Sequence, residues 1–285
     1  MTIDDLITVD DSYSLSLTGS SNTFTNNIDF LNTGTVTLGN AATDVFTFNG
    51  GLAFTGDAAV DLGAEIRSSA DSIDFGDGAV NLVANTIVDA TNNAEVASDA
   101  GNNISFGGAV ADGANAFDLT LDTGTAGDIT FVSTIGSSTD EIGALTVTLA
   151  DQVSFGGSVD AASFLQSAAP NTGATTFEGG FDLGGNFAFT GEAITLKGAN
   201  TATGSATFTN AGEYALASGG SLSADGGVTF NGTGATRLAG GLSSDGADFV
   251  FGTSVIVDED ITISTGAGGG LIQFDQAISG SGVLT

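Results

Sequence analysis

The feature that most constrains this chain is a phenylalanine that recurs at nearly constant spacing. A short motif surrounds it: an aliphatic or small residue, one polar residue, Phe and then usually a Gly-rich turn. Most steps between successive members are about 21–25 positions and two are about 31, within the range that is typical of repeat architectures. The nine phenylalanines of the motif are Phe75, Phe106, Phe131, Phe155, Phe177, Phe208, Phe230, Phe251 and Phe274.

The segments between these phenylalanines have the pattern of short strands. Residues 145–149 and 261–263 alternate between apolar and polar side chains, and a period of two is that of a strand. Turn-forming pairs such as those at 77–78 and 231–232 separate the runs. Gly, Thr, Asn, Ser and Asp disfavour helix interiors. We therefore predict strand and loop even for residues 160–169, the best local helix candidate.

A repeat of this size cannot fold alone. One unit of about 22 residues, with two or three short strands, cannot bury its own apolar side chains, whereas stacked units bury them between neighbours. The pattern predicts an all-β parallel β-solenoid of roughly 12 coils, with Phe stacked over Phe in one continuous inner column. The two long steps, from Phe75 to Phe106 and from Phe177 to Phe208, are then coils that carry an extra loop. An antiparallel sandwich is the alternative, which the constant Phe spacing disfavours.

The charge of the chain is strongly negative. It has 34 acidic residues against three basic ones, and a formal net charge of −31. The acids are spread from Asp4 to Asp275 in runs of at most three, which indicates a folded acidic surface and not an acidic tail. Nucleic-acid binding is not expected, because three scattered bases cannot form a basic footprint on phosphates.

The chain shows no internal division. No linker or composition shift interrupts it, so we expect residues 28–285 to form one continuous solenoid. Residues 1–27 are interpreted as an N-terminal segment that leads into it, either as a first coil or as an edge-pairing strand. No apolar run reaches the length of about 18 residues that a membrane span needs, so membrane insertion is not expected. The N-terminal residues lack the pattern of a signal peptide, which suggests a mature product or an excised segment.

The residues available for chemistry are almost limited to carboxylates. With no His and no Cys, the usual general bases, thiol nucleophiles and zinc ligands are missing. The densest acidic cluster, Asp258-Glu259-Asp260, is the candidate for a metal site, with Ca²⁺ as the one candidate cofactor. Paired carboxylates could also hydrolyse glycosides, but adjacent strand residues point to opposite faces. We therefore expect no enzymatic activity.

Several stretches resemble the strand repeats of large bacterial exoproteins. They are residues 128–177, the Phe-Gly-Gly-x-Val turns at 106–110 and 155–159, and the closing Gly-Ser-Gly-Val-Leu-Thr of residues 280–285. These resemble proteins of the filamentous-haemagglutinin-like and autotransporter-passenger group. The resemblance implies a right-handed β-helix that is secreted or displayed on a bacterial surface and used in adhesion. It also allows a host surface or a glycan as ligand.

These observations predict a non-enzymatic extracellular solenoid that forms or presents a surface fibre, stalk or matrix. The edge strands of a solenoid pair readily with other chains, and a repeat begins near Thr285. We therefore expect self-association by end-to-end stacking, or else one segment of a longer protein. Two alternatives stay open: a surface-layer lattice cross-linked by Ca²⁺, and a polysaccharide-active β-helix.

Overall fold

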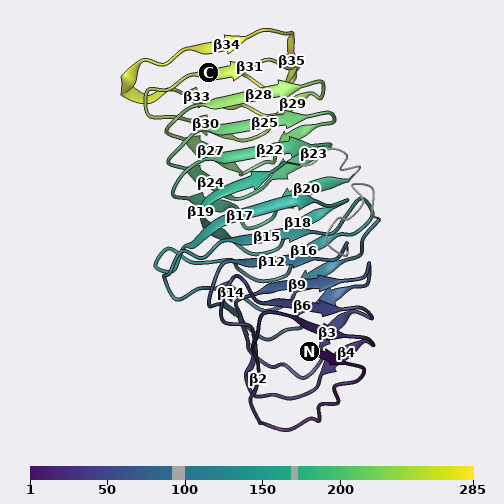
Figure 1. The fold of residues 1–285 in the computed structure, drawn as a ribbon. Helices are drawn as coiled ribbons and strands as arrows, with labels where there is room; N and C mark the ends of the chain where they lie inside the picture. The colour runs from purple at the N-terminus through teal and green to yellow at the C-terminus, as the bar shows by residue number, and fades with distance from the viewer. Residues whose placement is uncertain (92–99, 168–172) are drawn as a thin grey trace.

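Short parallel strands stack into a rod in this protein. The computed structural model describes residues 1–91, 100–167 and 173–285. In these ranges there are 35 β-strands, and the one helical element is the short 3₁₀ turn Gly266–Gly268. Coils follow one another from one end to the other, and the two termini lie at opposite ends (Figure 1). The fold is the predicted all-β parallel β-solenoid, with about 12 coils of about 22 residues.

Each coil contributes strands to three faces of the rod. The first face contains β1 (Thr2–Ile3), β3 (Asn22–Phe24), β6 (Val45–Phe48), β9 (Glu65–Ser68), β12 (Thr86–Asp89), β15 (Leu119–Asp122), β22 (Phe187–Gly191), β25 (Ala206–Asn210), β28 (Val228–Gly232), β31 (Phe249–Phe251) and β34 (Ile272–Phe274). The second contains β4 (Ile28–Phe30), β7 (Leu52–Phe54), β10 (Ile73–Asp74), β13 (Ile104–Phe106), β16 (Ile129–Phe131), β18 (Val153–Phe155), β20 (Ala174–Phe177), β23 (Ala193–Leu196), β26 (Tyr214–Leu216), β29 (Thr236–Leu238), β32 (Val255–Val257) and β35 (Ile278–Gly280). The third contains β2 (Leu15–Leu17), β5 (Val36–Leu38), β8 (Val60–Leu62), β11 (Val80–Leu82), β14 (Val110–Ala111), β21 (Phe181–Leu183), β24 (Ala199–Ala202), β27 (Ser221–Ala224), β30 (Gly241–Ser243) and β33 (Ile263–Ser264).

Two longer strands run from the third face into the first. They are β17 (Ile142–Leu149) and β19 (Val159–Gln166), and β19 pairs with both β21 and β22. Strand β19 covers most of residues 160–169, where strand and loop were predicted; Ala168 and Ala169 lie outside the described residues.

The alternation seen in the sequence decides which side chains enter the rod. In β16, Ile129 and Phe131 are buried, and Thr130 between them is half-buried on the outside. The backbone bonds run between coils: the Ile129 N–H donates to Gln152 O at 2.9 Å, and the Val132 N–H donates to Phe106 O at 2.9 Å. Each coil is thus held to the coil before it and the coil after it, while its side chains fill the interior.

The phenylalanines stack inside the rod, but in two columns and not in the single predicted one. The five from Phe75 to Phe177 stack on the second face, with successive ring centroids 4.4–5.5 Å apart. The four from Phe208 to Phe274 stack on the first face, 4.7–5.2 Å apart. Eight of the nine are buried, and Phe274 at the end of the rod is partly buried.

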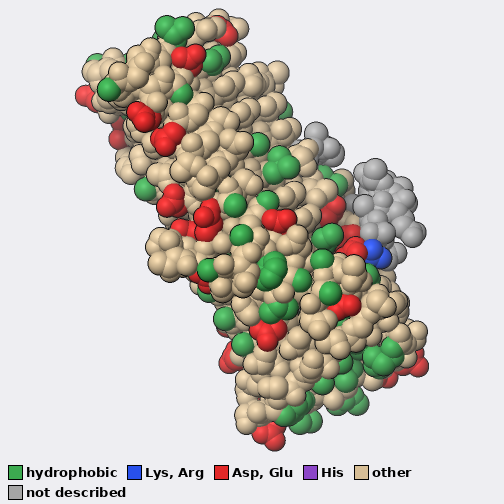
Figure 2. Space-filling model, turned by 60° about the vertical axis from the view of Figure 1, so that its left-hand side comes forward, with side chains coloured by type: hydrophobic (Ala, Val, Ile, Leu, Met, Phe, Trp, Pro, Cys, Tyr) green, Lys and Arg blue, Asp and Glu red, His purple; other side chains and the backbone are tan. Residues whose placement is uncertain are grey.

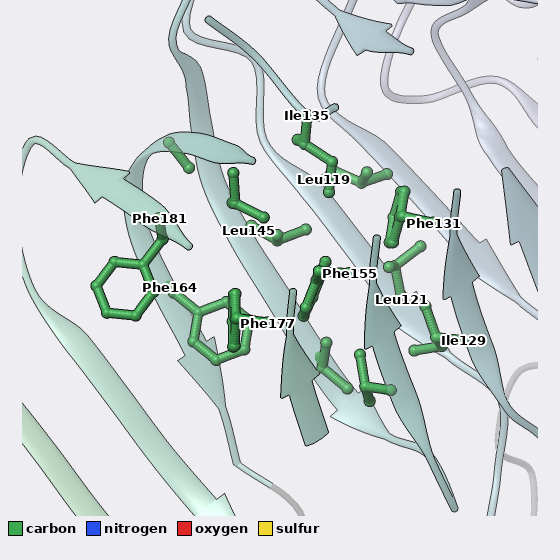
Figure 3. Packing of buried hydrophobic residues seen from close by; sticks show 14 of the residues in the cluster. Leu119, Leu121, Ile129, Phe131, Ile135, Leu145, Phe155, Phe164, Phe177 and Phe181 are labelled. Atoms are coloured by element: carbon green, nitrogen blue, oxygen red, sulfur yellow. The ribbon is translucent and has the colours of Figure 1, made fainter. Parts of the chain in front are cut away.

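The change of column takes place around Phe177 (Figure 3). Its ring stacks on Phe155 at 4.4 Å and meets Phe164 and Phe181 edge to face at 5.3 and 5.4 Å. Phe164 and Phe181 both stack on Phe187, which begins the column of the first face. The rings of Phe164, Phe177, Phe181 and Phe187 therefore connect the two columns.

The two long Phe-to-Phe steps have different origins. Phe75 directly follows β10, which pairs with the strand of Phe106, β13. One coil therefore accounts for the whole step and is longer than the others, as predicted; its residues 92–99 lie outside the described ranges. From Phe177 to Phe208 the extra-loop prediction is wrong. Phe177 pairs with Leu196 in the next coil, and Phe208 belongs to another face. The long step is a change of face and contains no added loop.

Candidate functional site

The predicted metal ligands Asp258, Glu259 and Asp260 do not converge. Both Asp258 carboxylate oxygens accept from Arg237 Nη1 at 2.8 Å. Glu259 Oε2 accepts from Ser218 Oγ at 3.0 Å, and Asp260 Oδ1 accepts a backbone N–H of the last coil at 2.9 Å. Each carboxylate thus has a different partner. Within the described ranges, no group of three or more acidic side chains is arranged to hold a metal ion.

Each basic side chain forms an ion pair, and Arg237 joins two carboxylates. Lys197 Nζ lies 2.7 Å from Glu178 Oε1 on the preceding coil. Arg237 joins Glu213 on one neighbouring coil at 3.0 Å to Asp258 on the other at 2.8 Å. The hydrogen bonds that Arg237 donates to Asp258 and Glu213 raise the pKa of Arg237 above its ordinary value. These pairs are largely exposed, so each contributes little to stability.

On the third face, Glu141 lies with two carboxylates that the sequence did not single out, Asp160 and Asp182. Glu141, Asp160 and Asp182 line a groove of about 180 Å³, whose other walls are Ser137, Ser138, Leu183, Gly184 and Thr203. Asp160 and Asp182 are register partners in β19 and β21, and Glu141 Oε1 accepts the Gly184 N–H at 3.0 Å. Burial, with smaller contributions from Asp182 and Glu141, raises the pKa of Asp160. Asp160 and Asp182 are one coil length apart in the sequence, and this spacing is the signal from which their proximity could have been predicted.

We predict that Asp160→Asn stabilises the protein at neutral pH. A carboxyl whose pKa is raised by folding favours the folded state while protonated, and loses that contribution as the pH rises through the raised value. At pH 7 the amide removes this penalty, so unfolding should cost more by up to about 1 kcal/mol. Thermal melts from pH 7 down to about pH 3 should show the difference shrinking as Asp160 becomes protonated. The exposed Asp245→Asn variant is the control, and an equal effect there would contradict the prediction.

The acidic doublet Asp140-Glu141 also separates. Glu141 lies in the groove, while Asp140 Oδ1 accepts the N–H of Ala114, and this bond lowers the pKa of Asp140. Asp112 is buried beside it and accepts the Phe117 N–H at 2.6 Å, and burial raises the pKa of Asp112. Asp112 thus bonds within the loop after β14, and Asp140 bonds this loop to the next coil, so both aspartates stabilise the fold.

On the face in view in Figure 2, the red carboxylates are scattered, with uncharged surface between them. Carboxylates spread in this way repel the carboxylates of other copies that approach this face.

These features define the chain as a parallel β-solenoid with an acidic surface. Comparison with models of protein families, with curated proteins and with solved structures finds no match. In the part of the chain that the structure describes, no helix is long and apolar enough to cross a membrane.

Proposed function

We propose that this chain is a non-enzymatic structural protein outside the cell, which forms or presents a fibre, stalk or matrix at a bacterial surface. The observation that carries the proposal is the unbroken ladder of coils. On the second face alone, 12 strands from β4 to β35 pair in parallel without interruption. A rod in which every coil is bonded to both neighbours keeps its two ends at a fixed distance, as a stalk requires.

The surface supports a role in an exposed environment. Trypsin-like proteases would find three cleavable side chains in 285 residues, and all three form ion pairs. The chain has no Cys and one Met, so little sulfur can be oxidised. The likeness of its repeats to bacterial exoproteins points the same way.

The proposal predicts that antibodies label the protein on intact cells. We expect immunogold electron microscopy of unpermeabilised producing cells to show label outside the envelope, at a density that permeabilisation does not raise. A cytoplasmic protein labelled in parallel controls for intact envelopes. Label that appears only after permeabilisation would overturn the extracellular role.

The same preparation separates the proposal from its two alternatives. EDTA should leave a β-paired fibre intact, whereas it would dissolve a lattice held by Ca²⁺. Release of reducing ends from acidic or neutral polysaccharides would instead indicate a polysaccharide-active β-helix.

A further inference from the structure

The interior of the rod is incompletely covered at both of its ends. Among the described residues, seven apolar side chains pack against the core while remaining partly exposed, and six of them belong to the first or the last coil. These six are Ile3, Leu6, Leu15 and Leu17 at one end, and Phe274 and Leu284 at the other. Both ends therefore present core positions that a further coil would cover.

The C-terminal edge is the more apolar of the two. Phe274 stacks on Phe251 at 4.7 Å and ends its column. Around it, Leu271, Ile272 and Ile278 are 68%, 42% and 47% exposed. Ile272 and Ile278 are the register partners of the buried Phe249 and Val255, so their side chains occupy core positions that no coil within residues 1–285 covers.

The backbone at this edge is ready to pair. The Phe249 N–H donates to Leu271 O at 2.8 Å, and the Asp275 N–H donates to Phe251 O at 2.9 Å. Because successive residues of a strand bond in opposite directions, the N–H and C=O groups of Ile272 and Phe274 point to the open side.

The N-terminal edge offers the matching groups. Met1 O and Ile3 O accept from the N–H groups of Thr23 and Thr25, at 2.8 and 3.0 Å. The N–H and C=O groups of Thr2 therefore point away from the rod. One end thus exposes β34 and the other exposes β1, both on the first face and both running in the same direction.

The C-terminal edge also lacks the usual protection against pairing. Natural edge strands are commonly blunted by Lys, Pro or other charged residues. Residues 266–285 contain one charged side chain, Asp275, although the whole chain has 34 acids. Repulsion between copies is therefore weakest at this end of the rod.

We propose that the C-terminal edge of one copy binds the N-terminal edge of a second copy, head to tail. Shifting one copy along the rod axis places coil on coil and continues all three faces in parallel. Joining two like ends would oppose the strand directions instead. A head-to-tail contact does not close on itself, so it generates a filament. This inference rests on the proposed function and names its partner, a second copy of this chain.

The test compares two double variants that add the same charges to the same strands. Ile272→Lys/Ile278→Lys places ammonium groups at core positions of this head-to-tail contact, called the joint below, where they would be buried without a partner. Gln273→Lys/Ser279→Lys places them on the outward-facing neighbours. Sedimentation velocity and electron microscopy over a concentration series, at about 0.15 M salt, measure assembly. We expect filaments from the wild type and the control, and an assembly concentration at least about tenfold higher for the joint variant.

A third variant tests the joint from the other end. Thr2→Pro removes an outward-pointing N–H and leaves both bonds from β3 in place, so it should also weaken assembly. Circular dichroism shows whether each variant keeps its fold. Wild type that stays monomeric or forms only closed dimers overturns the joint, as does equal assembly of all variants. If the joint is overturned in this way, immunogold label on intact cells would still support the extracellular role. Conversely, filaments together with purely intracellular label would support the joint and overturn the extracellular role.

Discussion

Phe177→Ala is expected to lower the free energy of unfolding by about 3–5 kcal/mol, the usual cost of removing a fully buried aromatic ring. Phe177 is completely buried and contacts four other rings: Phe155, Phe164, Phe181 and Phe187. Because these rings join the two columns, the cavity would separate the N-terminal half of the core from the C-terminal half. Stability in a solenoid is carried by contacts between neighbouring coils. Calorimetry should therefore show a lower melting temperature and a transition that broadens or divides.

Phe274→Ala is the matched control for that measurement. It removes the same side chain from the end of a column, where one ring lies below it and its outer side is partly exposed. Under conditions that keep the protein monomeric, we expect a loss of less than about 2 kcal/mol. Equal losses for the two variants would contradict the importance of the column change.

The solenoid itself could be predicted from the sequence because one residue type marked nearly every coil. A phenylalanine between polar neighbours must point inward in a strand, and most of the steps between these phenylalanines leave room for one coil each. Inward rings one coil apart then have to stack. This periodicity, together with the period-two strands and the turns between them, favours the parallel fold over an antiparallel sandwich.

The column change was hidden because spacing does not identify the face. A long step fits one long coil, as from Phe75 to Phe106, or one coil and part of the next, as from Phe177 to Phe208. Only the pairing of Phe177 with Leu196 distinguishes the two cases. Leu and Phe can both occupy an inward position of a strand. On the second face the Phe motif therefore stops at Phe177, while the column of core side chains continues with Leu196.

The acidic groove was missed for a related reason. Asp160 and Asp182 are adjacent across a coil, but this requires the register of β19 and β21, which the sequence leaves open. The cluster at 258–260 was misleading in the opposite way, because its three acids lie in the bend after β32 and each bonds to a different partner. Proximity in the sequence therefore says less about a site in a solenoid than separation by one coil.

Two coils approach closely at a corner that has Gly in both of them, Gly212 and Gly234. Gly234 lies in the turn between β28 and β29, directly over Gly212 of the preceding coil. A Cβ at Gly234 would collide with the carbonyl oxygen of Gly212, and the Asn210 amide nitrogen lies 2.6 Å from the same position. The Gly212 carbonyl is part of the backbone and accepts a hydrogen bond from the Asn210 side-chain amide, so it cannot move aside as the end of a flexible side chain can.

Gly234→Ala is therefore expected to destabilise the protein by about 3 kcal/mol, because the added methyl group must push two bonded coils apart. Gly241→Ala in β30 is the control: its Cβ would have only Thr262 O near it, at 3.7 Å, an ordinary contact distance. Since Ala also restricts the unfolded chain more than Gly does, this variant should stay within about 1 kcal/mol of the wild type. Chemical denaturation of both variants measures the difference. A Gly234→Ala protein as stable as the Gly241→Ala protein would mean that the coils separate at this corner without loss, which a continuous intercoil ladder does not permit.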